Sequence, residues 1–536
     1  MPSSARPLLR PPLVLAGACL ALAGYCPAQS PQVLVFDSGQ DDRGQAVTTD
    51  ATGAIIVGGA SGSGLNNTFA ILKYNAAGSL QWLARTQGLP DAYTGYAPSD
   101  LLTDAAGNIY AAGTATKALP FLQFEYGWLV ASFTPAGAQR WTQLVNGSGN
   151  SYDRALGAAL HPAQGLYVTG VTSDAWGRGD WLTIKYSTDG VEQWRRVEAG
   201  LGNTEDQPVA IKTDAAGNAV VLGFRESSQG GPRDLRVIKY DPAGNVLWRA
   251  DYAATATSDD YPNDLAIDAA GNIYVVADVG TLSAEDPTSA TTLKFDASGN
   301  LLFVLSGPGK GGSAVALDGA GNFVVSGTSV GPVGSNVVDQ TSKFTPAGVL
   351  LWSFPASSTN LAVDEVDGGV YLTRRYAYSV VKLNSAGAFQ WEQGVSPGVV
   401  ANDALVDPAT GAFVITGNST STGGNIVTAR FAAGSTPPPP PPPPPPVPAA
   451  PSGLGTSAKK GSISLSWTDH ANNESGFRIE RATGNGAFVE IATVGANVRS
   501  YNNTGLTKGV SYTYRVRAFN ASGNSAYSNP ATAIPR

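Results

Sequence analysis

A short turn sequence recurs along this chain and constrains its fold more than any other feature. Each copy places an Asp, or once a His, three to four residues before a Gly, and an apolar run such as residues 273–276 follows. The Asp side chain can accept hydrogen bonds from its own backbone, and Gly adopts a positive φ at little cost. Each copy is therefore predicted to be the turn of a β-hairpin. The eight copies begin at Asp50, Asp104, His161, Asp214, Asp268, Asp318, Asp364 and Asp407.

A second hairpin follows most of these turns and ends in a large aromatic residue. In residues 210–248, the Asp214 turn is followed by a second turn at residues 240–244 and then by Trp248. Two hairpins in series make a four-stranded antiparallel unit, and the spacing of 39 to 59 residues between the aromatic residues lies in the range of repeat arrays. We therefore predict an all-β chain whose units are the blades of a β-propeller. The aromatic residues are Trp82, Trp141, Trp194, Trp248, Phe303, Trp352 and Trp391.

The last unit, residues 404–431, supplies three strands and lacks the fourth. The missing strand is predicted at the other end of the chain, where residues 33–36 match the pattern of residues 79–82 and place Phe36 in the aromatic column. Pairing of this strand with the last unit closes the ring and removes two exposed sheet edges. The prediction is an eight-bladed propeller. Seven blades is the alternative if the divergent unit at residues 363–391 is not a full blade.

The repeat pattern Asp-x-x-Gly-Asn-x-Tyr-Val, then Lys-Tyr-Asp-x-x-Gly-x-x-x-Trp, resembles the bacterial β-propeller repeat known as SBBP. The resemblance covers residues 30–433, with Ser132 in place of the Lys in the second repeat and a truncated seventh repeat. It implies a propeller and a secreted or surface location, and it implies no particular reaction. The regular recurrence of the Lys predicts a structural role in packing. The Lys residues are Lys73, Lys185, Lys239, Lys294, Lys343 and Lys382.

The first 28 residues have the pattern of a secretory signal peptide. Arg6 and Arg10 precede an apolar run at residues 13–23, and small residues precede a cleavage site before Gln29. This run is too short to cross a bilayer, so we expect no transmembrane span in the mature chain. Lipid attachment at Cys19 is the alternative interpretation. Both cysteines lie in this segment, so the mature chain is expected to have no disulfide.

The sequence predicts four segments: a signal peptide (1–28), the propeller (29–433), a proline-rich linker (434–449) and a β-sandwich (450–536). The ten prolines at residues 437–446 cannot form ladders and give a stiff extended spacer of roughly 30 Å. Residues 462–467 and 512–518 alternate apolar and polar residues, as half-buried strands do. This segment resembles a fibronectin type III domain, which implies a core Trp at Trp467 and a tyrosine corner at Tyr512, with Lys508 where that family usually has Pro.

Function is expected on the propeller face that carries the variable loops, since loops on a rigid scaffold often bind ligands. These loops hold acidic and aromatic residues that could form a rim around the channel mouth. Tyrosine rings stack on sugars and carboxylates bind hard cations, so a polysaccharide, a basic protein surface or Ca²⁺ is predicted there. The alternative is that each acidic side chain only bonds nearby loop backbone and stays solvated. The rim residues are Asp41, Asp42, Asp91, Tyr93, Tyr96, Tyr152, Asp153, Glu205, Asp206, Asp259, Asp260 and Tyr261.

The composition excludes some classes of function. The formal net charge is −7 and no Lys/Arg cluster stands out, which argues against nucleic acid as a partner. Only two histidines occur, which disfavours catalysis or metal binding by His. We predict a monomeric, non-catalytic binding or adhesion scaffold without cofactor, apart from the Ca²⁺ alternative. It would act outside the cell or at its surface, with the periplasm as the alternative location. The alternative function is a carbohydrate-active enzyme with two carboxylates at the channel mouth.

Overall fold

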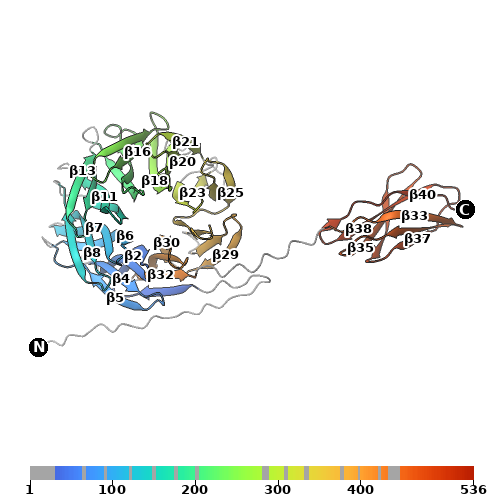
Figure 1. Ribbon diagram of the computed structural model, residues 1–536, viewed down its shortest axis with the longest axis horizontal. Coiled ribbons are helices and arrows are strands. Elements are labelled where there is room, and N and C mark those ends of the chain that lie inside the picture. The colour runs from blue at the N-terminus through green and yellow to red at the C-terminus, as the bar shows by residue number, and fades with distance from the viewer. Residues whose placement is uncertain are drawn as a thin grey trace. The chain divides into compact units, whose positions relative to one another are not determined.

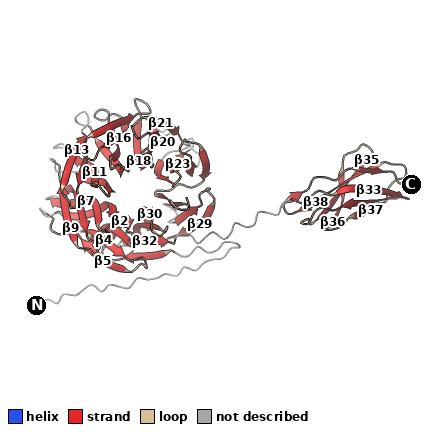
Figure 2. Cartoon of the chain, viewed as in Figure 1, coloured by secondary structure: helices blue, strands red, loops and turns tan. Residues whose placement is uncertain are grey.

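The computed structural model describes residues 31–62, 68–89, 93–119, 123–147, 153–173, 179–198, 204–280, 289–306, 312–330, 337–374, 379–395, 399–419, 424–432 and 447–536. The predicted signal peptide and the proline run lie outside these residues. The described residues contain strands and no helix, as the all-β prediction requires (Figure 2). None of them therefore forms a helix long and apolar enough to cross a membrane. The chain divides into two units, residues 1–435 and residues 436–536.

In the described part of the first unit, the strands form eight antiparallel sheets of four strands each. The sheets follow one another around a ring, with the first strand of a sheet toward the centre and the fourth toward the outside (Figure 1). This arrangement is propeller-like. We number the sheets 1 to 8 in chain order and call the contact between neighbouring sheets a seam.

The first four sheets are continuous in the chain. Sheet 1 consists of β2 (Asp41–Thr49), β3 (Ile55–Gly62), β4 (Thr68–Tyr74) and β5 (Leu80–Arg85). Sheet 2 consists of β6 (Thr94–Thr103), β7 (Ile109–Leu119), β8 (Gln123–Phe133) and β9 (Gln139–Val145). Sheet 3 consists of β10 (Arg154–His161), β11 (Gly165–Ser173), β12 (Gly179–Tyr186) and β13 (Glu192–Glu198). Sheet 4 consists of β14 (Asp206–Thr213), β15 (Ala219–Glu226), β16 (Arg233–Tyr240) and β17 (Val246–Tyr252).

Sheets 5 to 7 follow the same order, and sheet 8 takes its outer strand from the N-terminal side of sheet 1. Sheet 5 consists of β18 (Asp259–Ile267), β19 (Ile273–Gly280), β20 (Ser289–Phe295) and β21 (Leu301–Ser306). Sheet 6 consists of β22 (Gly312–Leu317), β23 (Phe323–Val330), β24 (Val337–Phe344) and β25 (Leu350–Phe354). Sheet 7 consists of β26 (Leu361–Val363), β27 (Val370–Arg374), β28 (Ser379–Leu383) and β29 (Phe389–Gly394). Sheet 8 consists of β30 (Val399–Val406), β31 (Phe413–Ser419), β32 (Ile426–Phe431) and β1 (Gln32–Phe36).

The divergent unit at residues 363–391 forms a sheet of its own. Its first strand, β26, has only three residues, yet β26, β27, β28 and β29 pair in order as in the other sheets. The divergent unit therefore has shorter strands, and their number is unchanged.

The predicted turns have the backbone geometry that the sequence requires. The eight turn glycines, from Gly53 to Gly411, all have positive φ between 66° and 97°. In the Asp214 turn, Asp214 Oδ1 accepts hydrogen bonds from the backbone N–H groups of Ala216 (3.0 Å) and Asn218 (2.9 Å). The Asp and the Gly thus fix the turn together, as predicted.

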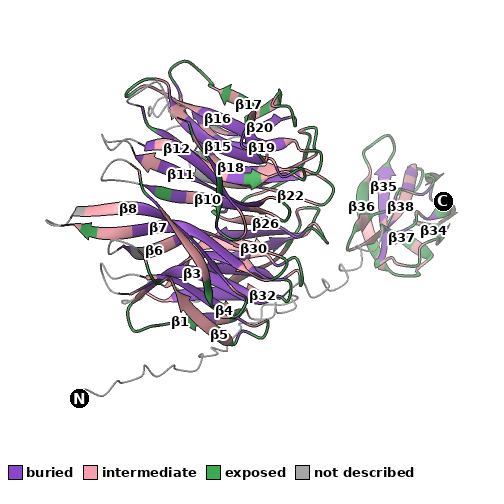
Figure 3. Cartoon of the chain, turned by 60° about the vertical axis from the view of Figure 1, so that its left-hand side comes forward, coloured by how far each residue is buried: buried purple, intermediate pink, exposed green. Residues whose placement is uncertain are grey.

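Burial follows the position of a strand in its sheet. Every residue of β3 except the last is buried, because neighbouring sheets cover both of its faces. The outer strand β17 instead alternates between half-buried and exposed residues, as Figure 3 shows in pink and green. The middle strands therefore read as continuous apolar runs, while the outer strands show period-2 alternation.

The strand predicted after the signal peptide pairs with the last sheet. β1 runs antiparallel to β32, with Val33 opposite Ala429 and Phe36 opposite Ile426. The predicted place of Phe36 in the aromatic column was wrong, because Gln32 lies opposite Arg430, which stands where other sheets have the column Lys. Phe36 instead packs in an apolar cluster shared by sheets 8 and 1.

The second unit is a sandwich of two antiparallel sheets. One sheet contains β33 (Ser452–Lys459), β34 (Ser462–Thr468) and β37 (Ser500–Thr504). The other contains β36 (Val489–Gly495), β35 (Gly476–Thr483), β38 (Tyr512–Asn520), β39 (Gly523–Asn524) and β40 (Ala531–Ala533). Trp467 packs against Phe477 in the core, with ring centroids 5.6 Å apart. The Tyr512 hydroxyl accepts a hydrogen bond from the Thr507 backbone (3.2 Å), which is the predicted tyrosine corner.

Candidate functional site

The repeated Lys and Trp residues lie at the seams between sheets. Lys239 is directly opposite Trp248, and its Nζ is 2.9 Å from Asp214 Oδ2 in the turn of the same sheet. Trp248 Nε1 donates to the Ala297 carbonyl of the next sheet (3.0 Å), and Lys239 Nζ donates to the same oxygen (3.3 Å). This Lys–Trp lock therefore has the structural role that its recurrence predicted. The same sharing of one carbonyl recurs for Lys73 and Trp82 on Pro135, Lys185 and Trp194 on Pro242, and Lys343 and Trp352 on Ser385.

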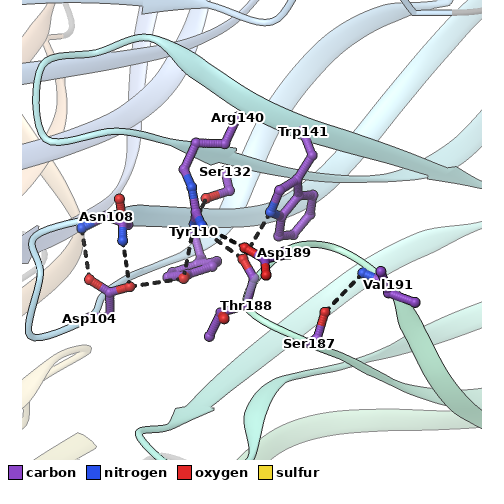
Figure 4. A network of polar contacts seen from close by, with 10 residues as sticks. All are labelled: Asp104, Asn108, Tyr110, Ser132, Arg140, Trp141, Ser187, Thr188, Asp189 and Val191. Atoms are coloured by element: carbon purple, nitrogen blue, oxygen red, sulfur yellow. Dashed lines mark hydrogen bonds and ion pairs between the residues drawn. The ribbon is translucent and has the colours of Figure 1, made fainter.

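Sheet 2 lacks the column Lys, and an arginine replaces its function (Figure 4). Ser132 stands opposite Trp141 in the register, where other sheets have Lys opposite an aromatic residue. Arg140 Nη1 donates to Ser132 Oγ (3.1 Å) and to the Thr188 carbonyl of sheet 3 (3.2 Å), while its Nη2 is 3.0 Å from Asp189 Oδ1. Trp141 Nε1 donates to the same Thr188 carbonyl (3.0 Å). The cation is thus supplied from the neighbouring strand.

Four of the predicted rim carboxylates are buried, with 0 to 3% of each residue exposed: Asp42, Asp153, Asp206 and Asp260. Each lies at or next to the start of the first strand of its sheet and accepts backbone hydrogen bonds. The donors are Ser38 for Asp42 (2.6 Å), Gly147 (2.5 Å) and Ser173 (2.6 Å) for Asp153, Glu226 for Asp206 (3.0 Å), and Ala254 for Asp260 (2.8 Å). Burial raises the pKa of Asp206 to about 6. These four residues bond backbone as the alternative interpretation describes, but they are buried, whereas that interpretation expected them to stay solvated.

Three other rim residues converge on one arginine of sheet 4. Arg233 Nη2 is 2.8 Å from Glu205 Oε2, the Arg233 backbone N–H donates to Asp259 Oδ1 (2.9 Å), and Arg233 Nη1 donates to the Tyr261 hydroxyl. The guanidinium carbon also lies 5.4 Å from the centre of the Tyr261 ring. This cluster joins the start of sheet 4 to the start of sheet 5, with Glu205 paired to the guanidinium and Asp259 bonded to backbone.

Of the remaining rim residues, Asp41 and Tyr93 each contact another side chain. Asp41 pairs with Arg43 (2.8 Å), and the buried Tyr93 donates its hydroxyl proton to Glu125 Oε1 (2.5 Å). Asp91, Tyr152 and the side chain of Tyr96 lie outside the described residues. Within the described ranges, no group of three or more His, Cys, Asp or Glu side chains is placed to hold a metal ion.

A different set of carboxylates occupies the first strands, at the centre of the ring. In seven sheets, these strands contain a β-bulge four to six residues before the turn. In sheets 2, 5 and 8 the residue after the bulged position is an aspartate: Asp100, Asp264 and Asp403. We call these three residues the inner carboxylates.

Each inner carboxylate bridges two neighbouring sheets. One oxygen accepts from the next residue of its own strand, and the other accepts from the backbone of the adjacent first strand. The second contact joins Asp100 to Ala158 (2.9 Å), Asp264 to Val315 (3.0 Å) and Asp403 to Val47 (2.8 Å). The bulged residues add a second bridge, from Ser99 to the Ala155 carbonyl, Asn263 to the Gly312 carbonyl and Asn402 to the Gly44 carbonyl, each at 2.6 Å. The seams 2–3, 5–6 and 8–1 are thereby tied at their inner edges.

One cation, Lys212 on β14, acts on all three inner carboxylates. Burial raises the pKa of Asp100, Asp264 and Asp403, and the charge of Lys212 opposes this rise in each case. For Asp403, burial together with the nearby charge of Asp100 raises the pKa to about 6. The side chain of Lys212 is exposed, and the three aspartates are half-buried. The centre of the ring therefore carries charges of both signs that interact with one another.

The sequence contains a signal for this set that motif searching missed. Four residues before the turn Asp, sheets 2, 5 and 8 have Asp, whereas the other sheets have Ala46, Gly157, Ala210, Ala314 and Asn360. The signal is a difference between repeats, and it appears only when the repeats are aligned on their turns. Loop composition, which led to the rim prediction, does not contain it.

Comparison with known proteins gives a family for the second unit only. The model of the fibronectin type III domain matches residues 449–534, so this unit is a fibronectin type III domain. Solved structures similar to 17% of the chain include "Titin kinase and its flanking domains" (25% identity, 17% of that chain, TM-score 0.16) and the Fn3-like protein from Clostridium thermocellum (25% identity, 95% of that chain, TM-score 0.15). The β-propeller domain of Cps50 (Swd1) from Myceliophteria thermophila is similar over 74% of this chain and 99% of its own, at 11% identity and a TM-score of 0.40. No curated protein matches the chain.

Proposed function

We propose that this protein is a secreted, non-catalytic binding scaffold built on an eight-bladed propeller that its N-terminal strand closes. A propeller-like ring and a fibronectin type III domain both suit a binding or scaffold role. The SBBP-like repeat and the signal-peptide pattern favour a location outside the cell or at its surface. The ligand-binding site of the ring is assigned to the inner carboxylates and Lys212.

One observation carries this assignment. The four charged side chains come from the first strands of four different sheets, yet their charges interact. Hydrogen bonds to two backbone groups hold each aspartate, so the charges are preorganised and lose little entropy when a ligand binds. Three carboxylates against one ammonium favour a partner with cationic groups. Among polysaccharide and protein ligands, this chemistry fits a polysaccharide that carries amino groups.

The test uses two substitutions with opposite expected effects. The full chain is screened on a glycan array and then titrated calorimetrically with a soluble amino-sugar polymer. Lys212→Glu adds a fourth negative charge at an exposed position and should tighten binding severalfold, whereas Asp100→Asn should weaken it severalfold. Asp296→Asn, in an outer turn of sheet 5, should leave affinity unchanged. A chain that binds no glycan, or one whose binding is insensitive to Lys212→Glu, contradicts the proposal; binding of a basic peptide instead would replace the ligand class.

A second candidate function rests on the raised pKa of Asp403. A glycoside hydrolase needs one protonated and one ionised carboxyl group flanking the scissile bond. Burial and the charge of Asp100 raise the pKa of Asp403 to about 6, which makes Asp403 the candidate for the protonated group and its electrostatic neighbour Asp100 the candidate for the ionised one. Release of reducing sugar by the full chain, abolished by Asp403→Asn while binding is retained, would establish hydrolysis in place of non-catalytic binding.

A further inference from the structure

Three lysines that are far apart in the sequence lie at one end of the fibronectin type III domain. Lys459 and Lys460 belong to the turn between β33 and β34, and Lys508 lies in the loop before β38. These two segments are adjacent, because the Leu506 backbone N–H donates to the Gly461 carbonyl (3.0 Å). All three lysines are exposed. We call them the lysine tip.

The segment after β40 adjoins the same turns. The Arg536 backbone N–H donates to the Lys459 carbonyl (3.2 Å), and the Gly509 backbone N–H donates to the Pro535 carbonyl (3.4 Å). Arg536 is exposed and brings a fourth cationic side chain to this end of the domain. Ile534 is 52% exposed in the same segment. An apolar side chain therefore accompanies the cations.

Hydrogen bonds fix the backbone that carries Lys508. The Tyr512 hydroxyl accepts from the Thr507 backbone N–H (3.2 Å), and the Val510 backbone N–H donates to the Thr507 carbonyl (3.3 Å). The tyrosine corner thus closes the loop on both sides of the lysine. A backbone that is already fixed loses little conformational entropy when the tip binds a partner.

The acidic side chains of the domain are engaged elsewhere. Glu480 is 2.6 Å from Arg515, and Glu490 is 3.2 Å from Arg478. The other two acidic residues accept hydrogen bonds from loop backbone. In residues 447–536, which the structure describes without a gap, no ion pair involves the lysine tip. The four acidic residues of the domain are Asp469, Glu474, Glu480 and Glu490.

The lysine tip lies at the end of the domain away from the linker. Ser452, where β33 begins, pairs with Thr468, where β34 ends, so the lysine turn joins the opposite ends of these strands. Residues 436–536 have nine basic and four acidic residues, a formal net charge of +5, whereas residues 1–435 have a net charge of −12. The proline spacer predicted between them is roughly 30 Å long, and the Debye length is about 8 Å at physiological ionic strength. The negative charge of the first unit is therefore expected to be screened at the tip.

We propose that the lysine tip docks the protein on an anionic lipid surface. The turns present their cations together at the end of a sandwich, where a flat layer of anionic headgroups can contact all of them. Ile534 gives the tip an apolar side chain that can enter the boundary between headgroups and acyl chains. An anionic polysaccharide would not need this side chain, and Tyr512 at this end is buried and offers no ring face to a sugar. This second binding surface does not depend on the ligand of the ring.

Flotation of the full chain with lipid vesicles tests the proposal. The chain should bind phosphatidylcholine vesicles that contain about 30% phosphatidylglycerol and not vesicles of phosphatidylcholine alone, and it should be released as salt rises from about 0.1 M to about 0.5 M. The whole chain has a formal net charge of −7, so general attraction to an anionic surface is not expected. Binding would therefore report a local cationic site.

Substitutions of exposed residues locate this site. Lys459→Gln, Lys460→Gln and Lys508→Gln together should weaken vesicle binding roughly hundredfold, because each cation near the surface contributes roughly fivefold. Lys460→Gln alone should weaken it roughly fivefold, whereas the matched control Arg499→Gln should have no effect, since Arg499 is exposed at the other end of the domain. Ile534→Gln should weaken vesicle binding severalfold, because it removes the apolar contact.

Several outcomes would overturn the proposal. A chain that remains unbound at about 0.1 M salt has no such surface, and equal binding to neutral vesicles excludes a role for charge. Equal losses for Lys460→Gln and Arg499→Gln, or a triple variant that binds as wild type does, place the contact elsewhere. Binding of soluble polygalacturonate that the triple substitution abolishes, without binding to vesicles, would assign the tip to an anionic polysaccharide instead.

Discussion

The regular seams of the ring and the closing seam between sheets 8 and 1 solve the same packing problem with different residues. At the seam between sheets 3 and 4, the Trp194 ring covers Gly244, where an added Cβ would lie 2.8 Å from the ring, and Trp194 Nε1 donates to the Pro242 carbonyl (3.1 Å). At the closing seam, Gln32 Nε2 and Arg430 Nη1 donate to the carbonyls of Ala77 and Ala76, each at 2.6 Å.

The difference shows which part of the lock the closing seam shares with the seam between sheets 3 and 4. A donor to the carbonyls of the next sheet's second turn is present in both cases. The aromatic ring that covers the turn glycine, which we call the aromatic plate, is present only at the seam between sheets 3 and 4. The closing seam obtains its apolar contact from Leu34 and Phe36, which pack into a cluster with residues of sheets 1 and 8. It is also tied at its inner edge by Asn402 and Asp403. The two chain ends therefore replace one large side chain with several smaller contacts.

The largest expected effect is loss of the aromatic plate at a regular seam. Trp194 is 8% exposed and contacts the rings of Tyr167 (5.9 Å) and Tyr240 (5.7 Å). Trp194→Ala should lower the free energy of unfolding by about 3–5 kcal/mol, because it opens a cavity between sheets 3 and 4. Urea unfolding followed by circular dichroism measures the change. Trp194→Phe, which keeps the plate and loses the hydrogen bond, should cost about 1 kcal/mol; equal losses for both variants would show that the plate is not what holds the seam.

Loss of the buried Lys of the lock should have the second-largest effect on the free energy of unfolding. Lys239 and Asp214 are both nearly buried, and their charged atoms are 2.9 Å apart. Lys239→Met should cost about 3 kcal/mol, because it leaves the Asp214 carboxylate buried without its partner. Adding Asp214→Asn to this variant should recover part of the loss, since the amide needs no counter-charge. An unchanged midpoint for Lys239→Met would mean that solvent already screens the pair.

At the seam between sheets 2 and 3, the cation comes from another position: Arg140 on the fourth strand takes the place of a Lys on the third. Arg140→Gln should cost about 1–2 kcal/mol through the lost bonds to Ser132, Thr188 and Asp189. Ser132→Lys in that background restores the residue found in other sheets, next to Asp104, and should return stability to within about 0.5 kcal/mol of wild type. If Ser132→Lys stabilises the wild-type chain as much as it stabilises the Arg140→Gln variant, the two cations do not substitute for each other.

A pH series probes the inner tie of the closing seam. The folded-state pKa of Asp403 is raised to about 6, above the value of an exposed aspartate. Its protonated form therefore favours folding: the contribution is full below the unfolded pKa near 4 and is lost as pH rises through about 6. The ring should gain thermal stability as pH falls from 7.5 to 5, a range in which Asp206, whose pKa burial also raises to about 6, contributes in the same direction. Asp403→Asn should reduce this dependence and leave the part that Asp206 contributes; a melting temperature that falls over the same range in the wild type would contradict the assignment.

The residues explain why some features could be predicted from sequence and others could not. The turns and the Lys–Trp lock recur, so each repeat supports the reading of the others. The register of β1 could not be read, because Gln32 and Phe36 are four residues apart and a shift by an even number keeps the same side chains on the same face. Composition also does not contain the backbone donors that the loops present. Those donors decide where the carboxylates of four rim residues point: Asp42, Asp153, Asp206 and Asp260. The inner carboxylates differ among repeats, so a search for recurrence passed over them.

The smallest expected effect is at the donor that replaces the aromatic plate. Gln32 is exposed, and its amide makes one hydrogen bond, to the Ala77 carbonyl. Gln32→Ala should cost only about 0.5–1 kcal/mol, because water can solvate the freed carbonyl. Gln32→Trp tests the comparison in the other direction, since the ring would lie over Gly78 as Trp194 lies over Gly244. If the closing seam accepts the aromatic lock, this variant should be at least as stable as wild type by urea unfolding; a loss of more than about 1 kcal/mol would show that the register of β1 leaves no room for the plate, and that the closing seam is specific for its smaller contacts.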